Sequence, residues 1–397
     1  MKILITSDLF LPTVNGVVTS VLSLAHGLRE HGHEVKILTL SDTVHTHTDG
    51  DVIYLGSFGA GLLYPGIRIR GFCPRKVLRE LIRWHPDIVH SQCEFSTFPI
   101  AKTIAKRCGA PLVHTYHTVY EDYTHYFTPC VRMGRAVAAR FTRHIVNRTD
   151  AVIAPTEKIR RLLTAYRVRV PISVIPTGLE LPSFAEVPQS EPLALRRKHG
   201  IPENQKILLY LGRLAEEKNI PALFGLLNDP NLHNTVLVLV GDGPFRAALE
   251  RTAQQMRLSE RVLFIGMVPH SAVPDYYRLG DVFVNASESE TQGLTYIEAM
   301  AAGIPVVCRN DPCLEGLIET GKNGFACCDT TEMAGAITKL LTEPSLRQSV
   351  TDAASETVRQ AYTSAAFAAS AEKLYTNLFP CDSGKNNQII SERNVTV

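Results

Sequence analysis

The sequence predicts an α/β protein made of two tandem Rossmann-like, doubly wound domains that face a cleft. Its 397 residues are enough for two domains. Short apolar runs alternate with segments of helical spacing along almost the whole chain, which indicates parallel sheets with right-handed crossovers. The run KILLYLG opens the second half much as KILITSD opens the chain. In such folds, ligands bind at the carboxyl ends of the strands.

The predicted strands are the short apolar runs of each half. In the first half they are Lys2–Ser7, Glu34–Leu40, Asp87–Ser91, Pro111–Tyr116 and Asp150–Ala154. In the second half they are Lys206–Leu211, Thr235–Val240, Val262–Ile265, Asp281–Asn285 and Pro305–Cys308. Helical patterns fill most of the intervals between them.

One proline-rich stretch, Pro176–Pro202, interrupts the series and is typical of an interdomain linker. We therefore expect an N-terminal domain at 1–180 and a C-terminal domain at 200–362. The helical segment at about 363–380 is expected to pack back on the first domain. The polar residues 381–397 are expected to form a flexible tail.

Composition excludes several classes of protein. No apolar run reaches the roughly 20 residues that span a bilayer, and the start MKILITSDLF lacks the features of a signal peptide, so we expect a cytoplasmic protein. The nine cysteines are odd in number and none forms a C-x2-C pair. This pattern favours neither a disulfide framework nor a zinc site, and we expect no metal.

Charge is distributed unevenly along the chain. Residues 1–170 carry 22 Lys/Arg and 13 Asp/Glu, whereas residues 171–397 carry 19 and 26. The excess lies within 66–170, which has 19 basic and 7 acidic residues. A basic half beside an acidic half indicates an anionic partner, for which nucleic acid and an anionic membrane both qualify. No nucleic-acid-binding motif fits the sequence, so we expect no nucleic acid.

The most specific motif is the segment from Glu290 to Val307, ETQGLTYIEAMAAGIPVV. A predicted strand ends in the loop SESETQG, and a helix begins near Leu294, where exposed backbone amides favour an anion. Glu298 lies about one turn into that helix, where it can accept hydrogen bonds from ribose hydroxyls. Glu290 lies on the loop and can reach a sugar bound at the helix start. The alternative is a solvated loop before an ordinary helix.

The segment resembles the paired-glutamate motif, Glu–seven residues–Glu, of the retaining glycosyltransferases of family four, and its flank matches E-A-M-A-A-G-x-P-V-V. The resemblance covers roughly residues 1–375. It implies the GT-B fold, a nucleotide sugar as co-substrate and no metal cofactor. It also implies that the hexose is positioned by Glu290 and by the backbone of four residues, namely Gln292, Gly293, Leu294 and Thr295.

The segment Gly212–Asn219, GRLAEEKN, resembles the family element G-R-x4-K-(G/N), whose arginine and lysine hold the donor diphosphate. The corresponding residues are Arg213 and Lys218. Cations are required there because the charge of the leaving diphosphate grows as the glycosidic bond breaks. A salt-bridged helix start is the alternative. The turn Gly241-Asp242-Gly243 resembles the family's G-x-G turn, although tight strand–helix geometry also produces such turns.

Two further positions in the first half match the family. Gly16 lies at a loop-to-helix junction where backbone can approach the donor phosphate, although this chain has Asn15 where relatives often have another glycine. His117 follows the strand PLVHTY and aligns with a family histidine that approaches the transferred sugar and orients or stabilises it. A buried structural histidine is the alternative, and it is favoured for His114, which lies within the strand.

The string HTYHTVYEDYTHY is similar to that of the bacterial 1,2-diacylglycerol 3-alpha-glucosyltransferases, which act at membrane surfaces. This resemblance implies UDP-glucose as donor and diacylglycerol as acceptor, with alpha linkage. A mannose donor, a soluble, phosphoinositide or polysaccharide acceptor, and an inactive sugar-nucleotide-binding protein stay open as alternatives. Epimerases and phosphorylases of the same fold are disfavoured by the combined motifs.

A basic amphipathic helix is predicted over Pro74–Trp84. Helical spacing gathers Arg75, Lys76, Arg79 and Arg83 on one side and places Trp84 with the apolar residues on the other. Such a helix suits an anionic bilayer, to which each basic residue contributes on the order of 1 kcal/mol. We therefore expect a peripheral protein on the inner face of the cell membrane. The alternative is an ordinary helix with one face on a sheet and one in water.

Overall fold

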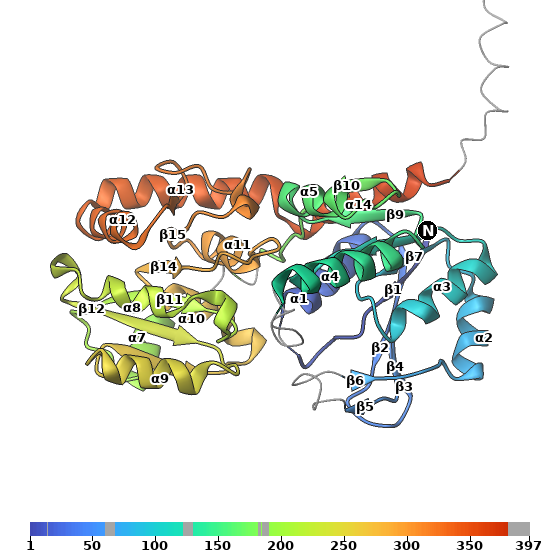
Figure 1. Ribbon diagram of the computed structural model, residues 1–397, viewed down its shortest axis with the longest axis horizontal. Coiled ribbons are helices and arrows are strands. Elements are labelled where there is room, and N and C mark those ends of the chain that lie inside the picture. Colours follow the sequence, from blue (N-terminus) through green and yellow to red (C-terminus); the bar gives the residue numbers. More distant parts are fainter. Residues whose placement is uncertain (14, 60–67, 122–129, 182–183, 185–189, 380–397) are drawn as a thin grey trace, which may run out of the picture.

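The computed structural model describes residues 1–13, 15–59, 68–121, 130–181, 184 and 190–379. It confirms the predicted fold class, because two parallel-sheet α/β units lie side by side along the long axis (Figure 1). The described residues exclude part of the linker and part of the string after His117. They also exclude the whole tail at 381–397.

The N-terminal sheet has the strand order β10-β9-β8-β7-β1-β2-β4-β3, and all its pairs are parallel except the edge pair β3–β4. A separate antiparallel pair is formed by β5 and β6. The bounds are β1 (Lys2–Thr6), β2 (Glu34–Leu40), β3 (His47–Asp49), β4 (Val52–Leu55), β5 (Phe58–Gly59), β6 (Arg68–Ile69), β7 (Ile88–Ser91), β8 (Leu112–Thr115), β9 (Ala151–Ala154) and β10 (Ile172–Val174).

The C-terminal sheet has the order β13-β12-β11-β14-β15-β16, and every pair is parallel. The central strands are apolar on both faces because helices cover both sides of a parallel sheet. The bounds are β11 (Lys206–Leu211), β12 (Thr235–Val240), β13 (Val262–Gly266), β14 (Val282–Asn285), β15 (Val306–Arg309) and β16 (Phe325–Cys327).

Helices follow the strands in both halves and cover the sheets. The α-helices are α1 (Gly16–Glu30), α2 (Arg75–Trp84), α3 (Thr97–Cys108), α4 (Val131–Val146), α5 (Glu157–Ala165), α7 (Ser190–Lys198), α8 (Pro221–Leu226), α9 (Arg246–Gln255), α10 (Val273–Leu279), α11 (Leu294–Ala301), α12 (Thr330–Thr342), α13 (Pro344–Ala361) and α14 (Ser364–Asn377). The 3-10 helices are η2 (Glu216–Lys218), η3 (Pro230–Leu232), η4 (His270–Ala272) and η5 (Pro312–Leu314).

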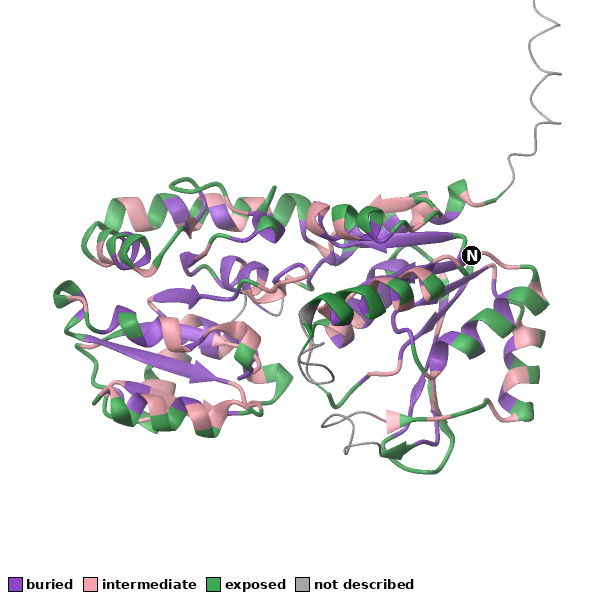
Figure 2. Cartoon of the chain, viewed as in Figure 1, coloured by how far each residue is buried: buried purple, intermediate pink, exposed green. Residues whose placement is uncertain are grey.

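Buried residues concentrate in the strands of both sheets and on the helix faces that cover them (Figure 2). The last helix, α14, returns from the C-terminal half and packs against α1. Phe367 and Tyr375 of α14 belong to the same core as Ile3 and Ile5 of β1. A side chain at Gly27 of α1 would meet the carbonyl oxygen of Ser364 at 2.4 Å, so the two helices can approach this closely only with glycine there.

No helix in the described part of the chain is long and apolar enough to cross a membrane. Eight described cysteines are free thiols, and the ninth, Cys381, lies outside the described residues.

Candidate active site

Several residues predicted to bind the donor gather at the start of α11, at the carboxyl end of the C-terminal sheet. Gly293 precedes the helix with φ 77° and ψ 57°, in the left-handed region. A side chain there would meet the Tyr296 ring at 2.4 Å, so both the backbone conformation and the space require glycine. The first amides of α11 have no partner within the helix and are available to an anion.

Glu290 and Lys218 form an ion pair at this position. The Lys218 Nζ lies 2.8 Å from Glu290 Oε1, and the side chains are only 19% and 12% exposed. Burial raises the pKa of Glu290, but Lys218, a hydrogen bond from Ser287 and the charge of Lys158 outweigh burial and hold the pKa below its usual value. The sequence motifs predicted both residues but not this contact, which joins the diphosphate motif to the paired-glutamate motif.

Glu298 has a different environment from Glu290. The Tyr277 hydroxyl donates to Glu298 Oε2 at 2.7 Å, and burial raises the pKa of Glu298 above its usual value although that hydrogen bond lowers it. No cation pairs with Glu298 within the described residues. A buried carboxylate with a single neutral donor can accept further hydrogen bonds, as hydroxyl groups of a ribose would supply.

Arg213 is half-buried directly after β11, beside two interlocking glycine turns. Side chains at Gly241 and Gly243 would meet the carbonyl oxygens of Gly212 and Leu214 at 2.0 and 2.2 Å. The amide of Leu214 in turn donates to the carbonyl of Asp242 at 3.0 Å. The glycines of the G-x-G turn are therefore required for packing against Gly212 and Leu214. This packing fixes the backbone position of Arg213, which lies between them.

The loop before α11 is fastened to the N-terminal half of the chain. The Thr291 hydroxyl donates to the carbonyl of His117 at 2.9 Å, and the Thr156 hydroxyl donates to the carbonyl of Thr291 at 2.9 Å. Lys158 donates to the carbonyl of Glu290 at 2.9 Å and pairs with buried Asp311 at 2.8 Å. The sugar-side loop thus takes its shape from both halves of the protein.

The side chain of Gln292 is hydrogen-bonded at the same junction between the halves. Its side-chain oxygen accepts from the Thr177 amide, and its side-chain nitrogen donates to the Thr177 carbonyl, both at 2.9 Å. The side chain therefore pairs with the segment that joins the two halves, so that only the backbone of Gln292 is left for a bound ligand.

The start of α1 meets the start of α11. Asn15 caps α1 by accepting a hydrogen bond from the Val18 amide at 3.0 Å, which gives the asparagine in place of a family glycine a structural role. A side chain at Gly16 would lie 3.3 Å from the Leu294 side chain. Gly16 therefore lies across from the start of α11.

His117 belongs to a buried polar cluster at the carboxyl ends of β7 and β8. Its Nε2 lies 2.6 Å from Gln92 Oε1, and burial lowers its pKa to about 4, although Glu94 opposes the shift. His114 differs from His117 in its exposure. It is fully buried and lies 3.3 Å from Glu94 Oε1, as expected of a structural histidine. His117 is partly exposed.

Two carboxyl groups of this cluster were missed by the sequence motifs. Asp8 accepts hydrogen bonds from the amides of Phe95, Ser96 and Thr97, and burial raises its pKa to about 6 although these hydrogen bonds oppose the shift. Glu94 accepts the Tyr120 hydroxyl at 2.7 Å. The available signal was positional, since Asp8 and Glu94 each follow a predicted strand by one to three residues.

The predicted membrane helix is α2, at the edge of the N-terminal half (Figure 1). Its basic residues are exposed, namely Arg75, Lys76, Arg79 and Arg83. Trp84, however, is half-buried: its Nε1 donates to Glu34, and the Lys36 ammonium lies 4.9 Å from its ring. The apolar side of α2 packs into the core of the sheet, as in an ordinary surface helix.

Another helix exposes apolar and basic residues together. On α4, Met133 and Val137 are 55% and 62% exposed, and they lie among exposed Arg132 and Arg140. Phe95, which is 54% exposed, stacks on Phe141 of α4 with ring centroids 5.8 Å apart. We call these six residues the α4 face. Phe95 follows Glu94 in sequence, so the α4 face borders the polar cluster of His117.

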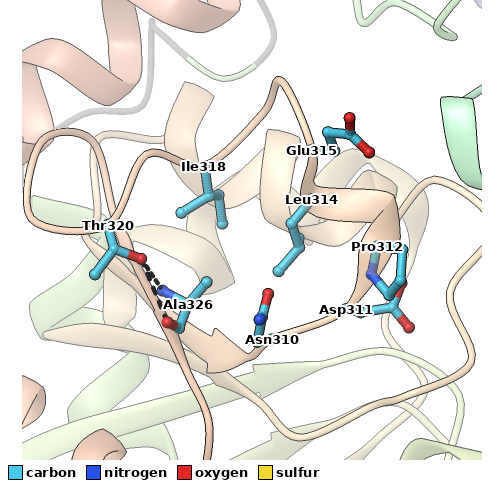
Figure 3. A pocket seen from close by; sticks show the side chains of 8 residues that line it. All are labelled: Asn310, Asp311, Pro312, Leu314, Glu315, Ile318, Thr320 and Ala326. Carbon is cyan, nitrogen blue, oxygen red and sulfur yellow. Dashed lines mark hydrogen bonds between the residues drawn. The ribbon is translucent and has the colours of Figure 1, made fainter.

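A separate pocket of about 220 Å³ lies beside η5 in the C-terminal half (Figure 3). Its lining includes Asp311 and Glu315, whose partners are Lys158 and Arg161 of α5. No predicted donor residue lines it.

Comparisons with known proteins match both halves of the chain. The family described as Glycosyltransferase Family 4 matches residues 14–181, and Glycosyl transferases group 1 matches residues 193–357. Alpha-monoglucosyldiacylglycerol synthase of Streptococcus pneumoniae is 37% identical over 349 residues, covering 86% of this chain and 78% of that protein. The synthase of the same name from Acholeplasma laidlawii is 30% identical and covers 99% and 100%.

The solved structure of Anabaena HepE in complex with UDP-glucose has the same fold, with a TM-score of 0.72 at 18% identity over 95% of this chain and 100% of that chain. Fold and site together define a nucleotide-sugar-dependent hexosyltransferase of the GT-B type. The chain belongs to glycosyltransferase family 4.

Proposed function

We propose that this enzyme transfers glucose from UDP-glucose to the 3-hydroxyl of diacylglycerol, with retention of alpha configuration. Two relatives whose names state alpha-glucosylation of diacylglycerol support the acceptor and the linkage. The observation that carries the donor site is the convergence of the Lys218–Glu290 pair, the start of α11 and His117 through Thr291.

In this proposal Glu298 accepts the ribose hydroxyls, and Arg213 and Lys218 hold the diphosphate. Glu290 and the backbone of residues 292–295, which run from the loop into the start of α11, position the hexose. His117 lies on the opposite side, on the N-terminal half. The two halves therefore divide the substrates, with the donor on the C-terminal sheet and the acceptor on the N-terminal sheet.

The proposed reaction breaks the bond between the anomeric carbon and the diphosphate oxygen through an oxocarbenium-like state. The acceptor oxygen attacks from the face that the diphosphate leaves, and the new bond forms on the same side. The acceptor proton passes to the departing phosphate oxygen, so the reaction requires no side chain as a strong base. Arg213, Lys218 and the amides of α11 stabilise the charge that develops on the diphosphate.

The function is tested with the purified full chain and mixed vesicles that contain diacylglycerol. Radiolabelled UDP-glucose, UDP-galactose and GDP-mannose are supplied separately, and lipid products are resolved by thin-layer chromatography. We expect one labelled glycolipid, formed from UDP-glucose and cleaved by an α-glucosidase. Absence of transfer to diacylglycerol from every donor would refute the acceptor, and a preference for GDP-mannose would refute the donor.

We also propose that the α4 face contacts the membrane, because it combines exposed apolar and basic side chains beside the polar cluster of His117. Met133→Asp with Val137→Asp is expected to lower binding to phosphatidylglycerol vesicles at least tenfold. Each buried apolar side chain contributes roughly 1.5 kcal/mol or more, and a carboxylate adds repulsion from the anionic surface. Co-sedimentation measures the bound fraction.

Leu193→Asp is the matched control, since Leu193 is an apolar residue 46% exposed on α7 of the other half. It is expected to leave binding unchanged. The pair Arg79→Glu and Arg83→Glu on α2 tests the long-range charge contribution, which is expected to weaken binding at low salt and much less at high salt. Equal loss from the α4 and Leu193 variants would exclude the α4 face as the contact.

A further inference from the structure

A line of buried hydrogen bonds connects the last helix of the chain to His117. The Tyr375 hydroxyl lies 2.6 Å from His90 Nδ1, and His90 Nε2 lies 2.7 Å from Thr115 Oγ1 and 3.3 Å from Gln92 Nε2. Gln92 Oε1 then lies 2.6 Å from His117 Nε2. Tyr375, His90, Thr115 and Gln92 are each at most 1% exposed. The motifs that identify the donor site include none of these four residues.

We propose that Gln92 is a positioning residue that holds His117 in the tautomer with its proton on Nε2. His117 then offers the lone pair of Nδ1 as an acceptor for a hydroxyl group of the hexose. The tautomer follows from the apoprotein alone, whereas the contact with the hexose rests on the proposed function.

The tautomer follows from the chemistry of the pair. The amide oxygen of Gln92 can only accept, so the His117 nitrogen that faces it must donate. A neutral imidazole carries one proton, and burial keeps His117 neutral near pH 7 by lowering its pKa to about 4. The lone pair is therefore on Nδ1, which forms no hydrogen bond within the described part of the chain.

The orientation of the Gln92 amide is set on its other side by His90. The Gln92 nitrogen donates to His90 Nε2, which must carry a lone pair, so the His90 proton is on Nδ1 and is donated to Tyr375. Burial lowers the pKa of His90 to about 3, so His90 is neutral as well. Ser20 supplies a second, longer hydrogen bond to Gln92 Oε1 at 3.5 Å.

The two histidines thus hold opposite tautomers, and reversing the Gln92 amide would reverse both. Tyr375 belongs to α14, whereas Ser20 belongs to α1, so the packing of α14 on α1 supports the orientation from two sides. The charged and titratable groups around His117 are Glu94, His114 and His90, of which Glu94 raises its pKa and His114 lowers it.

The first test is the tautomer itself, measured by NMR on the full chain with ring-labelled histidine. The signals of His117 are assigned by their loss in His117→Gln. We expect a neutral ring at pH 7 with Nε2 protonated and Nδ1 unprotonated. A protonated Nδ1 would overturn the proposal, and this readout does not depend on donor, acceptor or turnover.

The second test uses two substitutions of Gln92. Gln92→Leu removes the acceptor and is expected to lower kcat about tenfold with little change in donor KM, because the buried Nε2 proton loses its partner. Gln92→Glu keeps the acceptor but adds a negative charge. It is expected to move the acid limb of the kcat profile up by at least about one pH unit, since a nearby carboxylate stabilises the imidazolium.

Thr142→Val is the control for these variants. Thr142 is buried and its hydroxyl lies 3.2 Å from the Tyr116 hydroxyl, outside the line that reaches His117. We expect its pH profile and its His117 signals to match the wild type. An unshifted acid limb in Gln92→Glu, or the wild-type tautomer of His117 in Gln92→Leu with full kcat, would refute the positioning role. Loss of activity in all variants, including the control, together with a protonated Nδ1 would refute it as well.

Discussion

Arg213→Ala is expected to lower kcat by about 100-fold to 1000-fold and to raise the donor KM far less. One preorganised donor aimed at developing charge contributes roughly 3–4 kcal/mol to the transition state. Arg213 is half-buried beside the glycine turns, where burial lowers its pKa and the charge of Glu217 opposes the shift, and it stays cationic. Steady-state kinetics with UDP-glucose and diacylglycerol vesicles measures both constants.

Arg213→Lys is the matched variant, because it keeps the charge and loses the planar pair of donors. We expect its kcat to lie between those of the wild type and the alanine variant. An Arg213→Ala enzyme with normal kcat and a raised KM would show that the arginine holds the donor equally in ground and transition states. Normal values of both constants would remove Arg213 from the donor site.

Lys218→Met is expected to lower the free energy of unfolding by about 3–5 kcal/mol, besides reducing turnover. The substitution leaves Glu290 buried without its ion-pair partner, and an uncompensated buried charge is strongly destabilising. Urea denaturation at pH 7 measures the loss. Lys218→Met combined with Glu290→Gln removes both charges and is expected to recover most of the stability, although not the activity. A double variant as unstable as the single one would show that the ion pair does not account for the loss.

The stability lost in Lys218→Met is expected to depend on pH in a definite direction. In the wild type the pKa of Glu290 is lower in the folded state, so its contribution to stability is present above the unfolded pKa and is lost as pH falls through the folded pKa. In Lys218→Met we expect burial to raise the folded pKa of Glu290 above the unfolded value. The stability deficit of the variant should therefore grow as pH rises from about 4 to 7. A deficit that is constant with pH would contradict the assignment of the effect to Glu290.

The central part of the fold could be predicted because its strands are continuous apolar runs. All ten predicted strands are present, and each end differs by one residue at most. The missed strands are short or lie at edges, such as β3, which is fully exposed, and β10, which is half-buried. A three-residue strand without alternating or continuous apolar character has no periodicity to detect.

The site was predictable only where its residues are close in sequence. Glu290 and Glu298 lie within one segment, as do Arg213 and Lys218. The contact between Lys218 and Glu290, and the line from Tyr375 to Gln92, join segments far apart in the chain. The amphipathic spacing of α2 likewise did not show that its apolar side would pack on the sheet. Nor did it show that Trp84 would donate a hydrogen bond to Glu34.

Thr156, Lys158 and Thr177 form hydrogen bonds to the loop before α11, and these bonds have a consequence for inhibition. Separating the two lobes would remove these supports together, so the loop that carries Glu290 would lose its shape even with a nucleotide bound. A small molecule bound in the pocket beside η5 would contact Asp311, the partner of Lys158, and is expected to reduce turnover without competing with the nucleotide. Such a compound would act as a noncompetitive inhibitor with respect to UDP-glucose.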